Sequence, residues 1–381
     1  MKKIKKLVLM MAATGVIGLF AGCDTSSSSG GGEPEVPVVT ESVFELTADG
    51  IKLNGVLIEK TAEKKIMESA VTTTGSDFIE SSAANVYKGV FIKGRNVTLS
   101  PFIMGKYEVT QELYKAVMTD QKVTVDGTEY TLAAEPSNCS DGSTNYVLAD
   151  GETQKCRPVE GVTWFDAVYF CNVLSEKLNL TKAYEIAVTA VDSEGHITAG
   201  TVTPVTNANG YRLPTEAEWE FAARGGDSAA DAWNYLFSGA ATGKVLNADD
   251  APEAPYSSLR NTGLDRVGWY WYNIANGTTG ATISSGTAGY GTHEVGKKAA
   301  NALGLYDMSG NVWEWCYDWY GSVSTGDVTD PAGASSGSKR VYRGGSWYTI
   351  AEDATVCYRF YGFSEETWGS NLGFRLCRSA Q

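Results

Sequence analysis

The distribution of helix signals is the feature that most constrains the fold of this chain. Three segments carry such signals, at residues 111–118, 164–178 and 216–223. Beyond Gly226 no long helix is predicted, and short apolar runs alternate with loop-forming stretches. The sequence therefore predicts an α+β fold with few helices, short strands and much irregular loop.

Each helix segment has its own start or face signal. Thr110 and Thr215 are typical N-cap residues, and apolar residues recur at spacings of three and four from Trp164 onward. Glu218 lies three positions after Thr215, which is the capping-box spacing, and a glycine pair ends this helix. We therefore interpret Glu216 and Glu218 as acids that favour the helix dipole, not as general acid–base catalysts.

Composition and charge exclude several classes of function. With 43% apolar residues the chain can bury a core. It has 31 basic and 45 acidic residues, and no basic cluster follows residue 6, so we predict no nucleic-acid partner. His196 and His293 are the only histidines, which argues against a histidine-rich metal centre or a Ser-His-Asp triad.

The amino terminus reads as a targeting segment. Four lysines within residues 1–6 precede an apolar run at 7–20, which is the length of a signal-peptide core. The small residues before Cys23 resemble a bacterial lipobox. This predicts a signal peptide at 1–22, lipidation of Cys23 and a Ser/Gly/Pro tether at 23–39. We expect a lipid-anchored protein of the bacterial cell envelope, on its outer surface; plain secretion with an ordinary Cys23 is the alternative.

The chain after the tether divides into two parts that differ in sequence composition. Residues 40–85 are predicted to form an N-terminal extension with a small strand pair near 51–58, and residues 86–381 the main domain. Strands are expected at 90–92 and 97–99.

Six further cysteines permit disulfides in an exported protein. They are Cys139, Cys156, Cys171, Cys316, Cys357 and Cys377. Cys139 and Cys156 flank a turn-rich stretch that a bridge could close, and no CxxC motif is present.

Six motifs occur in the order found in one known family. They are Met104–Thr110, Pro158–Ala167, Tyr211–Glu220, Asn301–Trp315, Arg343–Trp347 and Asn371–Arg375. In this series the chain resembles the formylglycine-generating enzyme (sulfatase-modifying factor) family over residues 86 to 378. The resemblance implies a C-type-lectin-like domain with a twisted antiparallel sheet, two or three helices and much irregular loop.

The resemblance also identifies a family catalytic position. Catalytic members oxidise a cysteine of a sulfatase with copper(I) held by two cysteines, and soft sulfur ligands suit that ion. Cys357 matches the second cysteine, but Thr349 stands in place of the first. We therefore expect no such chemistry here, with copper and a catalytic Cys357 only if the enzyme hypothesis holds. Otherwise Cys357 is a buried thiol or pairs with Cys377 or Cys171.

A structural calcium site is also implied by the resemblance. It would use side-chain oxygens of Asp307 and Glu314 and backbone carbonyls of Gly310 and Val312, and Ca²⁺ prefers such hard oxygen ligands. In the alternative, Asp307 and Asn311 only stabilise the turn.

An aromatic-rich segment near the C-terminus has the composition of a recognition surface. In the family it lines the groove for the substrate peptide, although some of its aromatic residues could pack inward. The predicted ligand-binding residues are Tyr342, Tyr348, Thr349, Ile350, Asp353, Tyr358, Phe360, Tyr361, Phe363, Ser364, Trp368 and Ser370.

The chain also resembles the lectin-fold variable proteins of diversity-generating retroelements, in its Arg343–Trp347 and Gly373–Leu376 segments. That resemblance implies diversification within 342–370, at the same twelve positions together with Gly362 and Gly369.

Three hypotheses follow. The first is a non-catalytic surface lipoprotein that displays a site for a protein or glycan ligand. The second is a metal-dependent oxidase of the formylglycine-generating type, acting on a protein cysteine. The third is a structural envelope lipoprotein.

Overall fold

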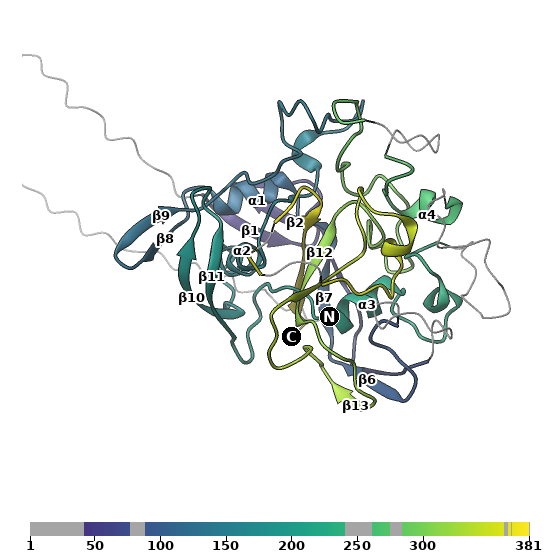
Figure 1. Ribbon diagram of the computed structural model, residues 1–381. Helices are drawn as coiled ribbons and strands as arrows, with labels where there is room; N and C mark the ends of the chain where they lie inside the picture. Colours follow the sequence, from purple (N-terminus) through teal and green to yellow (C-terminus); the bar gives the residue numbers. More distant parts are fainter. Residues whose placement is uncertain are drawn as a thin grey trace, which may run out of the picture. The chain divides into compact units, whose positions relative to one another are not determined.

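The computed structural model of the 381-residue chain describes residues 42–76, 88–240, 261–274, 284–361, 365–366 and 368–380 (Figure 1). The predicted signal peptide, Cys23 and the tether lie outside these residues. Within the described ranges no helix is long and apolar enough to cross a membrane.

The three predicted helices are confirmed. They are α1 (Gln111–Met118), α2 (Trp164–Lys177) and α3 (Glu216–Ala223). Thr110 caps α1, and complete capping boxes start α2 at Thr163 and α3 at Thr215. Short helical turns complete the set: α4 (Thr262–Val267), η2 (Gln154–Cys156), η3 (Asp231–Asn234) and η4 (Ala351–Ala354).

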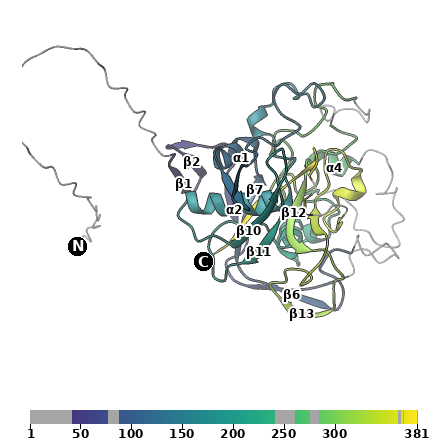
Figure 2. The same cartoon turned by 60° about the vertical axis from the view of Figure 1, so that its left-hand side comes forward.

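The predicted α+β fold with few helices and much irregular loop is confirmed, and its strands form several small sheets. The sheet orders within the described residues are β1-β2-β3, β13-β6-β5, β16-β7-β4, β14-β12-β15, β8-β9 and β10-β11. Two pairings are parallel, β6 with β13 and β12 with β15, and the first pair lies side by side at one edge in Figures 1 and 2. The predicted strand at 97–99 is confirmed within β6, whereas 90–92 is not a strand.

The strand bounds are as follows. The N-terminal strands are β1 (Phe44–Thr47), β2 (Gly50–Leu53), β3 (Val56–Leu57), β4 (Glu63–Lys65), β5 (Val71–Thr74), β6 (Arg95–Leu99) and β7 (Phe102–Glu108). The middle of the chain contributes β8 (Lys122–Val125), β9 (Thr128–Thr131), β10 (Tyr184–Val191) and β11 (Ile197–Pro204). The last are β12 (Trp313–Trp319), β13 (Gly326–Thr329), β14 (Arg340–Arg343), β15 (Leu372–Gly373) and β16 (Arg375–Ser379).

The N-terminal extension is part of the domain, not a separate segment. The expected strand pair exists as β2 and β3, joined by a turn at Asn54 and Gly55 with φ of 52° and 80°. However, β4 pairs with β7 and β5 pairs with β6. The predicted boundary at residue 86 therefore cuts through two sheets of the domain.

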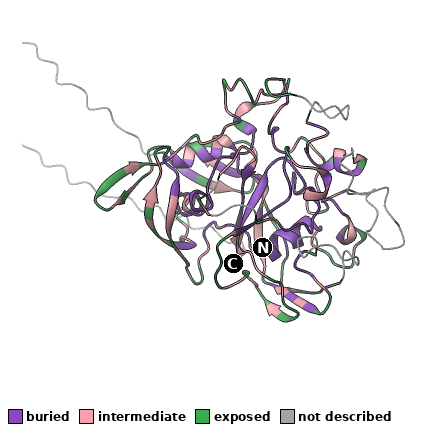
Figure 3. Cartoon of the chain, viewed as in Figure 1, coloured by how far each residue is buried: buried purple, intermediate pink, exposed green. Residues whose placement is uncertain are grey.

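Strand β12 joins the two halves of the core. Trp164 of α2 donates its indole N–H to the Cys316 carbonyl of β12 at 2.9 Å. Trp219 of α3 donates to the carboxylate of Glu314 in the same strand at 2.7 Å. Figure 3 shows α3 and β12 as buried and the β8–β9 hairpin as largely exposed. The predicted core role of Trp164, Trp219, Trp313 and Trp315 is confirmed.

All six described cysteines are buried free thiols, so the expected disulfides do not form. Neither the Cys139–Cys156 closure nor a bridge from Cys357 is present.

Removing residues 42–85 is expected to unfold the domain. A chain that begins at residue 86 loses β4, β5 and the buried side chains of Ile66 and Met67, which belong to the core around α3. Burial of such side chains stabilises by about 1.5–3 kcal/mol each. Thermal unfolding of the shortened chain, compared with one beginning at residue 42, measures this. Equal melting temperatures would place the domain start at residue 86 after all.

Candidate ligand-binding site

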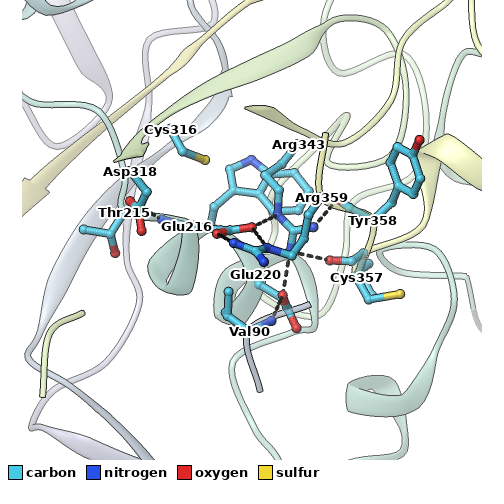
Figure 4. Close-up of polar contacts among 12 residues, drawn as sticks. Val90, Thr215, Glu216, Glu220, Cys316, Asp318, Arg343, Cys357, Tyr358 and Arg359 are labelled. Atoms are coloured by element: carbon cyan, nitrogen blue, oxygen red, sulfur yellow. Dashed lines mark hydrogen bonds and ion pairs between the residues drawn. The ribbon is translucent and has the colours of Figure 1, made fainter. Parts of the chain in front are cut away.

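Buried ion pairs fix the C-terminal segment to α3 (Figure 4). Glu216 accepts two hydrogen bonds from Arg359, at 2.6 and 2.7 Å, and Glu220 accepts one from Arg343 at 2.6 Å. Arg343 also donates to the carbonyl of Tyr358. Burial alone would raise the pKa of Glu216, but the adjacent arginines outweigh burial and lower it. The carboxylate is therefore ionised and holds this segment in place.

A double-glycine turn follows β14 and sets the direction of the next residues. Gly344 and Gly345 have φ of 98° and 75°, and a Cβ on Gly345 would lie 2.7 Å from the Cα of Ala354. Past this turn the indole N–H of Trp347 donates to the Ser370 carbonyl at 2.9 Å. The turn thus places Trp347 against the segment that precedes β15.

Trp347 is the centre of a cluster of aromatic side chains from distant parts of the chain. The cluster, here called the aromatic site, comprises Tyr146, Trp271, Tyr290, Trp347 and Tyr348. Ring centroids lie 5.1 Å apart for Tyr290 and Trp347, and 4.9 Å apart for Trp271 and Tyr348. Trp347 is buried, Tyr348 is 53% exposed and the other three are partly exposed. A buried ring therefore supports a group of accessible ones.

Polar contacts hold the aromatic site together. The Tyr146 hydroxyl donates to the Ser370 hydroxyl at 3.3 Å, and the backbone N–H of Trp271 donates to the Thr349 carbonyl at 3.0 Å. Beneath them, the buried Arg157 donates to the Tyr146 carbonyl at 3.2 Å and to the Thr292 hydroxyl at 2.9 Å. Tyr146 is thus held through its hydroxyl and its backbone, and Trp271 through its backbone.

The structure separates the predicted ligand-binding residues into two groups. Tyr342 and Tyr358 are buried, so they cannot contribute an accessible surface as predicted. Both pack on Trp313, with centroids 5.3 and 5.9 Å away. All four residues of β14 are buried, and the bridge from Tyr342 to Phe360 brings the segment with Tyr358 against this strand. Those that retain at least partial exposure are Tyr348, Thr349, Ile350, Asp353, Phe360, Tyr361, Trp368 and Ser370. Phe363 and Ser364, like Gly362, lie outside the described residues.

The predicted residues that retain exposure do not all belong to one binding surface. Tyr348, Thr349 and Ser370 belong to the aromatic site or bond to it directly. Tyr361 instead stacks on Tyr320 at 3.9 Å, and Trp368 stacks on His196 at 5.1 Å. The predicted segment therefore supplies one edge of the aromatic site and several separate contacts.

Of the five rings, only Tyr348 is among the predicted ligand-binding residues, and Trp347 enters the sequence analysis only as part of a family motif. Tyr146, Trp271 and Tyr290 lie in loops, and no local spacing relates them to Trp347. Only the unusual number of aromatic residues in irregular stretches could have pointed to them.

Comparisons with known proteins agree with this fold. The model of the sulfatase-modifying factor enzyme 1-like domain matches residues 57–380. The chain belongs to this family. The match begins near β4, in agreement with the strand pairing described above.

Three relatives illustrate how the family varies. The chaperone protein LppX of Paenibacillus barcinonensis is 32% identical over 326 residues, covering 82% of this chain and 94% of that protein. The formylglycine-generating enzyme of Thermomonospora curvata is 31% identical over 263 residues, covering 66% of this chain and 73% of the enzyme. Among solved structures, Treponema denticola variable protein 1 matches with a TM-score of 0.59 and 32% identity, over 84% of this chain and 95% of that one.

The residues at the family's copper position do not fit copper(I). The Thr349 hydroxyl donates to the Ser346 carbonyl at 3.0 Å and accepts from the Ser346 N–H at 2.9 Å, so it closes a local turn. Burial raises the pKa of the Cys357 thiol to about 12, which keeps it protonated at neutral pH. One protonated thiol, with a threonine at the position of the other cysteine, supplies no thiolate pair.

Of the two predicted side-chain calcium ligands, Asp307 has an oxygen available for a cation, whereas the oxygens of Glu314 already accept hydrogen bonds from other side chains. Asp307 is buried in a left-handed turn, and its Oδ1 has no partner within the described residues. Both oxygens of Glu314 accept from Arg375, at 2.6 and 2.7 Å, and one also from Trp219. Within the described ranges, no three His, Cys, Asp or Glu side chains converge as a metal site. Any cation here would therefore depend on Asp307 and backbone carbonyls.

The charge around Asp307 favours a cation. Burial raises the pKa of Asp307 to about 6 and that of Glu108 well above its usual range, and the negative charge of Glu314 adds to both effects. Arg375 offsets part of this negative charge, and Lys298 also acts on Asp307. A bound divalent ion would relieve the remaining repulsion.

Proposed function

We propose that this protein is an envelope lipoprotein that binds a ligand at the aromatic site and does not catalyse cysteine oxidation. The observation that carries the proposal is the grouping of Tyr348 with Tyr146, Trp271 and Tyr290 around the buried Trp347. Rigid rings with few rotatable bonds provide large contact area at low entropic cost, and such residues dominate binding hot spots.

The ligand class follows from the same composition and from the relatives. Aromatic rings stack on sugar faces or on apolar side chains, so a glycan or a protein segment fits. The chaperone name of the Paenibacillus relative favours a protein. The predicted lipid anchor at Cys23 would hold this site at the cell envelope.

We further propose that residues of the aromatic site and its neighbours are diversified between copies of the gene. The relative from Treponema denticola is named a variable protein, and this chain matches 95% of its length. Tyr348, Thr349 and Ile350 follow the double-glycine turn and retain exposure, so substitutions there would leave the core unchanged. Tyr342 and Tyr358 are buried and would tolerate less.

Variants of the aromatic site are expected to lose binding without losing the fold. Y348A and Y290A remove contact area, and loss of a hot-spot ring costs about 2 kcal/mol or more, at least a 30-fold weaker Kd. The probes are a random peptide library displayed on phage and an immobilised glycan array, each screened with the wild-type protein. Clones or glycans selected by the wild type are then titrated against the variants by calorimetry.

The control is Y130A, on the β8–β9 hairpin away from the aromatic site. It should bind as tightly as the wild type. Equal affinity of Y348A, Y290A and Y130A would place binding elsewhere. A Cys-x-Pro-x-Arg peptide incubated with copper-loaded protein is expected to keep its cysteine in mass spectrometry, and its conversion to formylglycine would favour the oxidase hypothesis instead.

Sequencing of codons 340–377 from many cells of the source strain tests diversification. We expect adenine-linked substitutions at the exposed positions Tyr348, Thr349 and Ile350, with a near-identical template repeat in the flanking DNA. Gly344 and Gly345 should not change, because their φ values require glycine. An invariant segment without a nearby template would point to one fixed ligand.

Calcium is expected to stabilise the protein through Asp307. A ligand that binds only the folded state adds about 2.7 kcal/mol at 100 times its Kd, so thermal unfolding in calcium should occur at higher temperature than in chelator. D307G removes the carboxylate yet suits the φ of 57°, and should abolish the calcium effect. D126G, a matched change at a φ of 49° in the β8–β9 turn, should retain it. An identical calcium shift in D307G would exclude Asp307 as a ligand.

A further inference from the structure

A cavity lies beside the first residues of α3 and is lined in part by Arg359. It has a volume of about 100 Å³ and shares no lining residue with the aromatic site. Its charged lining consists of Arg95, Glu216, Asp318 and Arg359. Ser322 and Ser324 also line it and are exposed, so they mark its opening to solvent.

Arg95 has no charge partner in this cavity. It is 7% exposed, and its Nη1 donates to the Val90 carbonyl at 2.9 Å. Its Nε is buried and meets no acceptor within the described residues. In the same ranges no carboxylate lies within 4.0 Å of its guanidinium, whereas the neighbouring Arg359 and Arg343 both contact one. A buried charge without a partner is costly, so this arginine calls for an acceptor.

The carboxylates that line the cavity are committed to other groups. Both oxygens of Glu216 accept from Arg359, and Arg343 lies 3.5 Å from one of them. Asp318 accepts the backbone N–H of Glu216 at 2.8 Å, as Figure 4 shows. The two carboxylates that line the cavity are therefore bound to other groups, and neither forms an ion pair with Arg95.

The titration behaviour of these groups agrees with an excess of positive charge. Burial is the main cause that lowers the pKa of Arg95. Repulsion from Arg359 adds to it, and the attraction of Glu216, Glu220 and Asp318 offsets it only in part. Burial, with repulsion from Glu216, raises the pKa of Asp318 to about 8, so at neutral pH Asp318 contributes little negative charge. The two arginines thus face the cavity with one ionised carboxylate between them.

We propose that this cavity binds a small oxyanion of phosphate or sulfate size, with Arg95 as its main ligand and the hydroxyls of Ser322 and Ser324 at the opening. The guanidinium fork presents parallel N–H donors that match the oxygens of such an ion. The volume of about 100 Å³ admits one ion of this size. The proposal does not depend on the aromatic site, and either can fail alone.

Thermal unfolding of the full chain in sodium phosphate and in sodium sulfate tests the site. Sodium chloride at matched ionic strength is the reference. At ten times Kd the unfolding equilibrium constant should fall about tenfold relative to chloride. Calorimetry with inorganic phosphate should give one site per chain.

Two variants separate the site from general charge effects. R95Q should lose the oxyanion response and, because it removes an unpaired buried charge, should match or exceed the wild type in chloride. R266Q removes an exposed cation at the end of α4 and should keep the full response. If R95Q does not fold, R95K keeps the charge but not the fork, and should bind phosphate at least 10-fold more weakly.

An oxyanion response that persists in R95Q would overturn the proposal. So would a wild-type protein that responds to chloride, phosphate and sulfate alike, since the cavity would then hold only water.

Discussion

Buried arginine–carboxylate pairs are the interaction on which the rest of this structure depends. Glu216 with Arg359, Glu220 with Arg343, and Glu314 with Arg375 are each nearly inaccessible to solvent. Each pair joins a regular element to the loop-rich C-terminal part. The arginines also donate to backbone carbonyls, mostly in loops: Arg375 to Gly105 of β7 and to Tyr306, Arg359 to Gly321, and Arg343 to Val356. They therefore satisfy backbone acceptors that a larger sheet would otherwise satisfy. Removing one partner of such a pair costs about 3–5 kcal/mol, because it leaves a buried charge behind.

This frame explains how an accessible aromatic surface can sit on an irregular scaffold. The segment after β14 is fixed at its start by the ion pair of Arg343 with Glu220, and further along by the hydrogen bond from the Trp347 indole N–H to the Ser370 carbonyl. Between these two anchors, Tyr348, Thr349 and Ile350 contribute little to the core. Substitution there would change the contact surface and not the fold, since stability resides in the anchors. The same separation suits a scaffold for one fixed ligand or for many.

The parts of the fold that local signals determine were predictable. Thr110, Trp164 and Thr215 mark the three helices because capping and amphipathic spacing act within one or two turns. Partners distant in sequence were not predictable in the same way. Glu216 was interpreted as a dipole acid, but its carboxylate is bound by Arg359, 143 residues later. The pairing of β4 and β5 with the domain, and the burial of Tyr342 and Tyr358, likewise depend on contacts that no local pattern encodes.

The residues of the aromatic site were equally difficult to predict from local sequence patterns. Trp347 and the turn before it lie in a family motif, but Tyr146, Trp271 and Tyr290 reach that turn only through the tertiary fold. Thr349 illustrates how the turn is kept without the family's first cysteine. Its hydroxyl bonds to both the N–H and the carbonyl of Ser346, so one small polar side chain closes the turn that presents Tyr348. The geometry of the segment thus survives without a metal-binding residue at this position. A scaffold of this kind can change from chemistry to recognition by substitution within a single loop, because the buried pairs that hold the loop lie outside it.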